Sequence, residues 1–111
     1  MARKVKVTVG TENIFADLGF ADPQTHLLKA QIVSEIYRLA TTEKLTQAQS
    51  GARMGITQPE VSRLFHGHFR EYSVERLMGF LTTFNREIEI VSRPIKPRSK
   101  ARRIRFTPEM A

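Results

Sequence analysis

Polar side chains that can contact the edges of DNA bases stand close together in the middle of the chain. Gln58 carries a carboxamide that can pair with an adenine edge, and Arg63 carries a guanidinium that can pair with guanine or hold a phosphate. The full set of candidate contacts comprises Gln47, Thr57, Gln58, Pro59, Ser62, Arg63 and His66. Such side chains reach the bases of double-stranded DNA when they lie at the start of a helix that enters the major groove. The chemistry they offer is non-covalent recognition, and it requires a helix that begins near Thr57.

Two helix starts are marked in the sequence by the same pairing of residue types. Thr46 stands three residues before Gln49, and Thr57 stands three residues before Glu60. Each pair is a capping box, in which the threonine hydroxyl accepts from a backbone N–H and the Gln or Glu side chain accepts from the threonine N–H. The two starts therefore predict two short helices in succession.

A tight turn is predicted between these two helices. Gly55 stands where a chain that leaves a helix most often needs a positive φ, and Pro59 falls in the first turn of the second helix, where its missing donor costs little. Residues 46–66 are therefore predicted to form a helix-turn-helix. The segment LTQAQSGARMGITQPEVSRLFHG, residues 45–67, resembles the helix-turn-helix of lambda-type phage repressors and of the Xre family.

This resemblance implies roles for three polar residues and marks two departures. Gln58 occupies the position of a base-reading glutamine, Gln47 that of a phosphate contact which also braces Gln58, and His66 that of a residue that holds the DNA backbone. Gly51 replaces the alanine that is usual in the family, and Ser50 stands where many relatives have an apolar residue. We expect the glycine to cost about 1 kcal/mol of helix stability. A small residue at this position also lets the two helices cross closely, while Ile56, Val61 and Leu64 fill the interface.

A second resemblance extends over more of the chain, from Asn13 to Pro94. The segments NIFADLGFADPQTHLLKAQIV and FREYSVERLMGFLTTFNREIEIVSRP, on either side of the helix-turn-helix, resemble the HigA-type antitoxins encoded beside toxins of the RelE/ParE superfamily, HigB type. This resemblance implies a protein that binds and silences an mRNA-cleaving toxin. It also implies that the protein represses its own operon as a homodimer on palindromic DNA.

A second candidate function is that of a stand-alone Xre-type transcriptional repressor without a toxin partner. Such a protein would use the same DNA-reading residues and would differ only in its partner. The apolar side chains Phe15, Leu18 and Phe20 do not decide between the two, because they can pack over the first long helix or await another protein.

Two further helices are predicted on the two sides of the helix-turn-helix. The first begins with Asp22 as N-cap and Pro23 at the first helical position, and it ends near Glu43. The second begins after Ser73 and is terminated by Asn85. Apolar residues at helical spacing are expected to face the core, namely Leu28, Ile32, Ile36 and Leu39 in the first helix and Val74, Leu77, Met78, Leu81 and Phe84 in the second.

Short strands are predicted near both ends of the chain. Val5, Val7 and Val9 alternate with polar residues, and Ile88 and Ile90 alternate with glutamates. The two segments can pair, valines against isoleucines and lysines against glutamates, within one chain or across a dimer axis.

The predicted fold is therefore all-α, a lambda-repressor-like helix-turn-helix domain of four to five helices with short terminal β-strands. The predicted organisation is an N-terminal strand and FADLGF segment at 1–21, the DNA-binding domain at 22–86, a terminal strand at 87–94 and a basic, disordered tail at 95–111.

Positive charge is concentrated at the two ends of the chain. The formal net charge is +7, and it divides into +3 for residues 1–11, −2 for residues 12–89 and +6 for residues 90–111. Three uses of the basic tail remain open: neutralising DNA phosphates, keeping the protein in solution as a disordered extension, or contacting an acidic partner.

Several classes of function are excluded or disfavoured by what the sequence contains. No phosphate-binding glycine loop, nucleophile–histidine–acid order or carboxylate pair stands out, so we expect no enzyme. Two histidines, His66 and His68, without a third ligand make a weak zinc signal, and we expect no metal or cofactor. There is no cysteine and no apolar run that could span a membrane, and the charged start differs from a signal peptide; we therefore expect a cytoplasmic protein, associated with the nucleoid through DNA.

Overall fold

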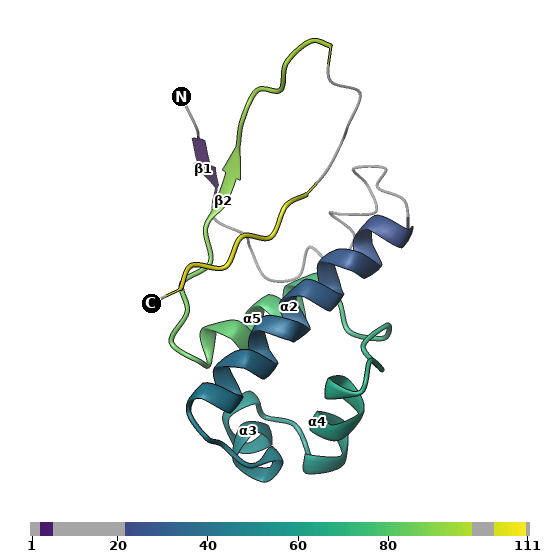
Figure 1. Ribbon diagram of the computed structural model, residues 1–111, viewed down its shortest axis with the longest axis vertical. Coiled ribbons are helices and arrows are strands. Elements are labelled where there is room, and N and C mark those ends of the chain that lie inside the picture. Colours follow the sequence, from purple (N-terminus) through teal and green to yellow (C-terminus); the bar gives the residue numbers. More distant parts are fainter. Residues whose placement is uncertain (1–2, 6–21, 99–103, 111) are drawn as a thin grey trace.

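The structure is a computed structural model that describes residues 3–5, 22–98 and 104–110 of the chain. Its elements are β1 (Arg3–Val5), α2 (Asp22–Thr42), α3 (Gln47–Met54), α4 (Gln58–Phe65), α5 (Val74–Thr82) and β2 (Ile90–Ser92). The four helices gather at one end of the molecule and the two strands lie beyond them (Figure 1). The predicted fold class, a lambda-repressor-like helical domain with short terminal strands, is confirmed.

The long helix α2 supplies one side of the hydrophobic core. Its described start is Asp22, which is itself helical, and it ends at Thr42, one residue before the predicted end. Leu28, Ile32 and Ile36 are buried, as their helical spacing predicts. α2 packs against both α4 and α5, so this helix fixes where the shorter helices lie.

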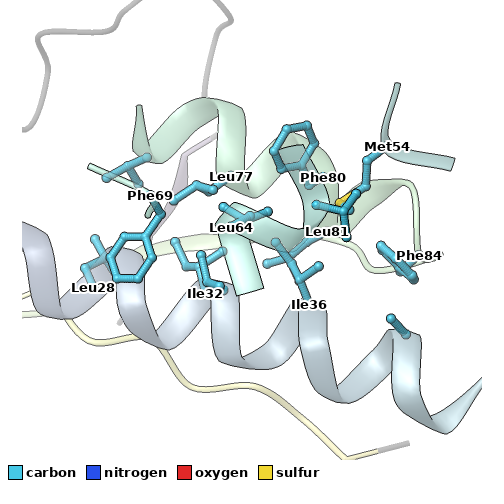
Figure 2. Packing of buried hydrophobic residues seen from close by; sticks show 14 residues of the cluster. Leu28, Ile32, Ile36, Met54, Leu64, Phe69, Leu77, Phe80, Leu81 and Phe84 are labelled. Carbon is cyan, nitrogen blue, oxygen red and sulfur yellow. The ribbon is translucent and has the colours of Figure 1, made fainter. Parts of the chain in front are cut away.

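The core closes where α4 and α5 meet α2. Its buried apolar residues are Leu28, Ile32, Val33, Ile36, Ala40, Met54, Val61, Leu64, Phe69, Val74, Leu77, Phe80, Leu81 and Phe84. Figure 2 shows the side chains of Ile32 and Ile36 pointing from α2 toward Leu64 of α4 and Leu81 of α5. α4 is therefore held by apolar packing on one side only, which leaves its other side available.

The start of α5 follows the predicted chemistry, and its end lies earlier than predicted. The Arg76 N–H donates to the Ser73 hydroxyl over 3.1 Å, so Ser73 is the N-cap. α5 itself ends at Thr82 with Thr83 as its C-cap, so the predicted terminator Asn85 lies beyond the end of the helix; its φ of 62° ends the turn that follows. Met78, expected in the core, is half-buried at its edge.

The terminal strands form a two-stranded antiparallel sheet within one chain. Val5 lies opposite Ile90, which confirms the valine–isoleucine pairing for the one pair that the structure describes. Lys4 lies opposite Val91, so the expected pairing of this lysine with a glutamate is wrong. The strands are antiparallel, so Lys4, which precedes Val5, lies opposite a residue that follows Ile90. The glutamates precede Ile90 in the chain. Val7, Val9 and the FADLGF segment lie outside the described residues.

The end of the chain returns to the helical body, and the prediction of a disordered tail is wrong for residues 104–110. Ile104 and Phe106 are half-buried and pack against the core, and Ile104 lines a small pocket with Leu28 of α2. The Arg86 guanidinium donates a hydrogen bond to the Glu109 carbonyl. The two apolar side chains, spaced two apart in a basic sequence, account for this attachment.

We expect Phe106→Ser to lower the free energy of unfolding by about 1 kcal/mol, because it removes half-buried apolar surface. Met110→Ser is the matched control, since the Met110 side chain is 74% exposed and should have no measurable effect. Urea unfolding followed by circular dichroism measures both. Equal effects of the two variants would contradict the attachment of this segment.

Candidate nucleic-acid interface

Both predicted capping boxes are present, and they fix the starts of α3 and α4. The Thr46 N–H donates to Gln49 Oε1 over 2.8 Å, and the Gln49 N–H donates to Thr46 Oγ1 over 3.1 Å. The same reciprocal pair joins Thr57 and Glu60 over 3.1 and 3.3 Å. Each helix therefore begins at a residue whose own side chain satisfies a free N–H of the first turn.

Hydrogen bonds from Thr57 also tune the Glu60 carboxylate. The backbone N–H of Thr57 and then its hydroxyl lower the pKa of Glu60 below the ordinary value of 4.5. Because the folded-state pKa is lowered, the cap interaction stabilises the fold at neutral pH and is lost as the pH falls through that lowered pKa. At neutral pH the Glu60 carboxylate therefore caps α4.

The turn between the two helices depends on two glycines. Gly55 has a φ of 78°, and the N–H groups of Gly55 and Ile56 donate to the Gly51 carbonyl over 2.7 and 2.9 Å. Gly51 is buried, and a Cβ at this position would lie 2.5 Å from the Ile56 carbonyl oxygen and 3.2 Å from Val61 Cγ2. The glycine is therefore needed for the close approach of α3 to α4, and the predicted close crossing at this small residue is confirmed.

Ser50, the second departure from the family pattern, is also buried. Its side chain is 1% exposed, and within the described residues its hydroxyl oxygen has no hydrogen-bond partner. A buried hydroxyl without a partner opposes folding, whereas an apolar side chain of the same size does not. The serine therefore weakens the packing of α3, as its place among apolar residues of relatives suggests.

The crossing of α3 and α4 brings two of the candidate contacts together. Gln58 Nε2 donates to Gln47 Oε1 over 2.7 Å, although the two residues are eleven apart in sequence. Gln58 is exposed and Gln47 is half-buried. The bond uses one donor of the Gln58 amide and orients the group, so its carbonyl oxygen and second N–H can face outward together.

The remaining candidate contacts lie on the outer side of α4 and at its two ends. Thr57, Pro59, Arg63 and His66 are exposed, and Ser62 is half-buried. Val61 and Leu64, on the inner side, have 0% exposed surface. The structure thus brings the predicted residues to one helix face that the core does not use.

His66 ends α4 with a defined ring orientation. His66 Nδ1 lies 2.6 Å from the Ser62 carbonyl oxygen, and since that oxygen only accepts, Nδ1 carries the proton. Gly67 follows with a φ of 97° and lets the chain turn away. The ring therefore presents Nε2 on the side away from the helix.

A groove beside the end of α4 contains residues that the sequence analysis missed. It has a volume of about 490 Å³ and is lined by Ala30, Val33, Ser34, Tyr37, Gln47, Leu64, Phe65, His66, Gly67 and Phe69. Tyr37 is 54% exposed, and its ring stands edge to face on Phe65 at 5.2 Å between centroids. The sequence contained one signal for this groove, a tyrosine on α2 outside the apolar stripe that faces the core. A tyrosine at such a position is common on helix surfaces, so by itself it does not indicate a groove.

The two arginines of the helix-turn-helix differ in their contacts within the domain. Arg53 of α3 donates to Glu43 over 2.7 Å and lies over the Phe84 ring at 5.2 Å. Arg63 is exposed in the last turn of α4. Arg53 therefore serves the fold, and Arg63 offers a positive charge on the outer face of α4.

The residues that the structure describes contain neither a cluster of metal ligands nor a membrane-spanning helix. Among them, no three His, Cys, Asp or Glu side chains come together as metal ligands would. Likewise, no helix that the structure describes is long and apolar enough to cross a membrane.

The buried inner face and polar outer face of α4, held by α3 across a glycine turn, define a helix-turn-helix domain. A family model described as a helix-turn-helix domain matches residues 14–93. A solved structure that bears the name of an XRE-family transcriptional regulator is similar to the chain, with 36% sequence identity and a TM-score of 0.73 over 80% of this chain and 100% of that one. No curated protein matches the sequence. The chain belongs to the XRE family of helix-turn-helix DNA-binding regulators.

We expect Gly51→Ala to destabilise the domain by about 1 to 3 kcal/mol, because the added Cβ meets the Ile56 carbonyl and neither helix can move without loss of core packing. Gly79→Ala in α5 is the matched control. A Cβ there meets nothing within 4 Å on an exposed helix position, so this variant should be more stable by about 0.5 to 1 kcal/mol. Thermal unfolding compares the two, and a stabilising Gly51→Ala would disprove the close approach.

Proposed function

We propose that α4 enters the major groove of an operator and that Gln58 reads an adenine there. The observation that carries this proposal is the 2.7 Å hydrogen bond from Gln58 to Gln47 at the exposed start of α4. A free glutamine side chain loses rotamer entropy when it binds a base, whereas one already held by a neighbour loses less. The remaining amide groups suit the N6 and N7 edge of adenine.

The other residues of the α4 face have supporting roles in this proposal. Arg63 pairs with guanine or a phosphate, Thr57 and Ser62 contact base edges or backbone, and Pro59 offers an apolar contact to a thymine methyl group. His66 stands where the resemblance implies a contact with the DNA backbone; because Nδ1 donates to the Ser62 carbonyl, a bond from Nε2 to a phosphate requires the imidazolium form, in which both ring nitrogens donate.

The groove beside α4 extends the proposed DNA surface toward α2. Gln47 and His66 line this groove together with Ser34 and Tyr37. Hydroxyl and amide groups donate to phosphate oxygens, and so does imidazole in its imidazolium form. We infer that one strand of the duplex passes along this groove while α4 reads the bases beside it.

We further propose that the protein acts as a homodimer on palindromic DNA in the cytoplasm, with no enzymatic activity of its own. One recognition helix of eight residues covers only a few base pairs. Two copies, spaced by about 34 Å along one face of the duplex, give a site long enough to be specific.

The particular function that we propose is that of an antitoxin. In this function the protein neutralises an mRNA-cleaving toxin of the RelE/ParE superfamily and represses its own operon. The support is the resemblance to HigA-type antitoxins between Asn13 and Pro94, which extends on both sides of the helix-turn-helix. A stand-alone XRE-type regulator is equally consistent with the fold and the α4 face, and it differs in having no toxin partner.

We expect Gln58→Ala to lose about 1 to 3 kcal/mol of discrimination between the promoter upstream of the gene and random DNA. Gln47→Ala should lose part of the same discrimination, because it frees the Gln58 side chain. In a double-mutant cycle the two losses should not add, since both act through one hydrogen bond. Fluorescence anisotropy at fixed salt measures all four proteins on both duplexes.

Gln49→Ala is the matched control for this cycle, because Gln49 caps α3 and is not on the α4 face. It should change stability rather than base preference. If Gln58→Ala weakened binding to the promoter and to random DNA equally, α4 would not be reading bases.

Co-expression with the product of the neighbouring short reading frame tests the antitoxin function. We expect a stoichiometric complex that restores growth to cells expressing that product. The Gln58→Ala variant is the control, since it should still form the complex and rescue growth while losing promoter binding. Specific promoter binding without complex or rescue would instead establish the stand-alone regulator.

A further inference from the structure

The segment that follows β2 carries positive charge that the helix-turn-helix family model does not include. The matched region ends at residue 93. From this residue to residue 105 the sequence contains seven cations and no acidic residue, namely Arg93, Lys96, Arg98, Lys100, Arg102, Arg103 and Arg105. The first acidic residue after them is Glu109. Arg93 is the last matched residue, and the other six cations are an addition to the matched domain.

The described parts of this segment are attached to the body on both sides. Before it, β2 pairs with β1. After it, Ile104 and Phe106 pack against the core, and Glu109 accepts from Arg86. A free solvated tail needs no such second attachment, so the cations that the structure describes, Arg93, Lys96, Arg98 and Arg105, lie next to attached parts of the chain.

The cations that the structure describes are open to solvent. Arg93, Lys96, Arg98 and Arg105 are all exposed. Pro94 and Pro97 lie between the first three and favour an extended backbone that spaces them apart. Ile95 is the one apolar residue from 93 to 98, so this stretch lacks the apolar centre that a protein interface usually has. Spaced cations on an extended chain suit a line of phosphates.

The position of this segment separates it from the proposed operator surface. The molecule is elongated, with principal extents of 47 × 28 × 24 Å. Figure 1 places α3 and α4 at one end of the long axis and residues 93–98 at the opposite end. The phosphates that these cations would meet are therefore not those beside α4 of the same protomer.

We propose that Arg93, Lys96 and Arg98 form a second DNA contact, which binds the phosphate backbone of a duplex segment other than the one under α4. This inference rests on the proposed function, because a protein held on its operator is surrounded by DNA at high effective concentration. The contact is independent of sequence and depends on salt through the release of counterions. The protein thereby bridges two DNA segments.

A capture experiment separates this inference from the proposed function. The promoter duplex is immobilised and saturated with the full-length protein, free protein is washed away, and a labelled random duplex is added. Retention of protein on the promoter reports the α4 contact, and capture of the labelled duplex reports the second contact. We expect the wild type to capture it, with capture decreasing steeply as salt rises.

Neutral and charge-conserving variants at the same positions provide the matched comparison. R93S/K96S/R98S should reduce capture at least five-fold and lower the salt slope of capture by about 2.7, while promoter affinity stays within two-fold. R93K/R98K keeps the charge and should capture like the wild type. Arg70→Ser removes one exposed charge elsewhere and should also have no effect.

Three results would overturn the inference. Undiminished capture by the neutral variant would show that these cations are not the contact. An equal loss of promoter affinity would place them on the operator instead. Equal losses in R93K/R98K would indicate a contact of arginine shape or of fold rather than of charge. Protein that is not retained on the promoter at all would contradict the proposed function and not this second contact.

Discussion

The close crossing of α3 over α4 at Gly51 is the constraint on which the DNA-reading surface depends. With no Cβ at this position, the Ile56 carbonyl and Val61 approach the α3 backbone directly. This approach sets the offset of the two helices, so that Gln58 Nε2 lies 2.7 Å from Gln47 Oε1. A wider crossing would preserve both helices and both caps but would separate the two amides. The chemistry of the site is thus fixed by a backbone contact rather than by any polar residue.

Features decided within a few residues of sequence could be predicted, whereas those decided by distant contacts could not. The capping boxes at Thr46 and Thr57 and the left-handed Gly55 follow from local backbone chemistry, and they are present as predicted. The spacing of Gly51 before Ile56 and Val61 predicts a close helix crossing, but it does not tell that the Ile56 carbonyl excludes even the Cβ of alanine, because that distance is set by residues of the turn and the next helix. The charge of residues 95–111 predicts a disordered tail. The packing of Ile104 and Phe106 could not be predicted, because the core surface that they cover is made by residues far away in the sequence.

The same distinction applies to the candidate site. Exposure of Gln58 and Arg63 on one face follows from the helical spacing of buried Val61 and Leu64. The groove that contains Tyr37 could not be predicted, because it forms only where α2 passes the end of α4. Periodicity tells which side of α2 is buried against the core. It does not tell which of the remaining positions adjoin another functional element.

The distribution of charge suggests a division of labour in the free energy of DNA binding. The α4 face is mainly neutral and polar, and Arg53 of the adjoining helix is committed to Glu43 and Phe84. Neutral groups discriminate among bases but contribute little of the salt-dependent affinity, which comes from phosphate neutralisation. In the proposed arrangement the cations at the opposite end of the molecule attract a second duplex segment, so base discrimination and this added attraction reside in separate surfaces. The two can then act on different duplex segments, so the attraction need not weaken the discrimination made by Gln58.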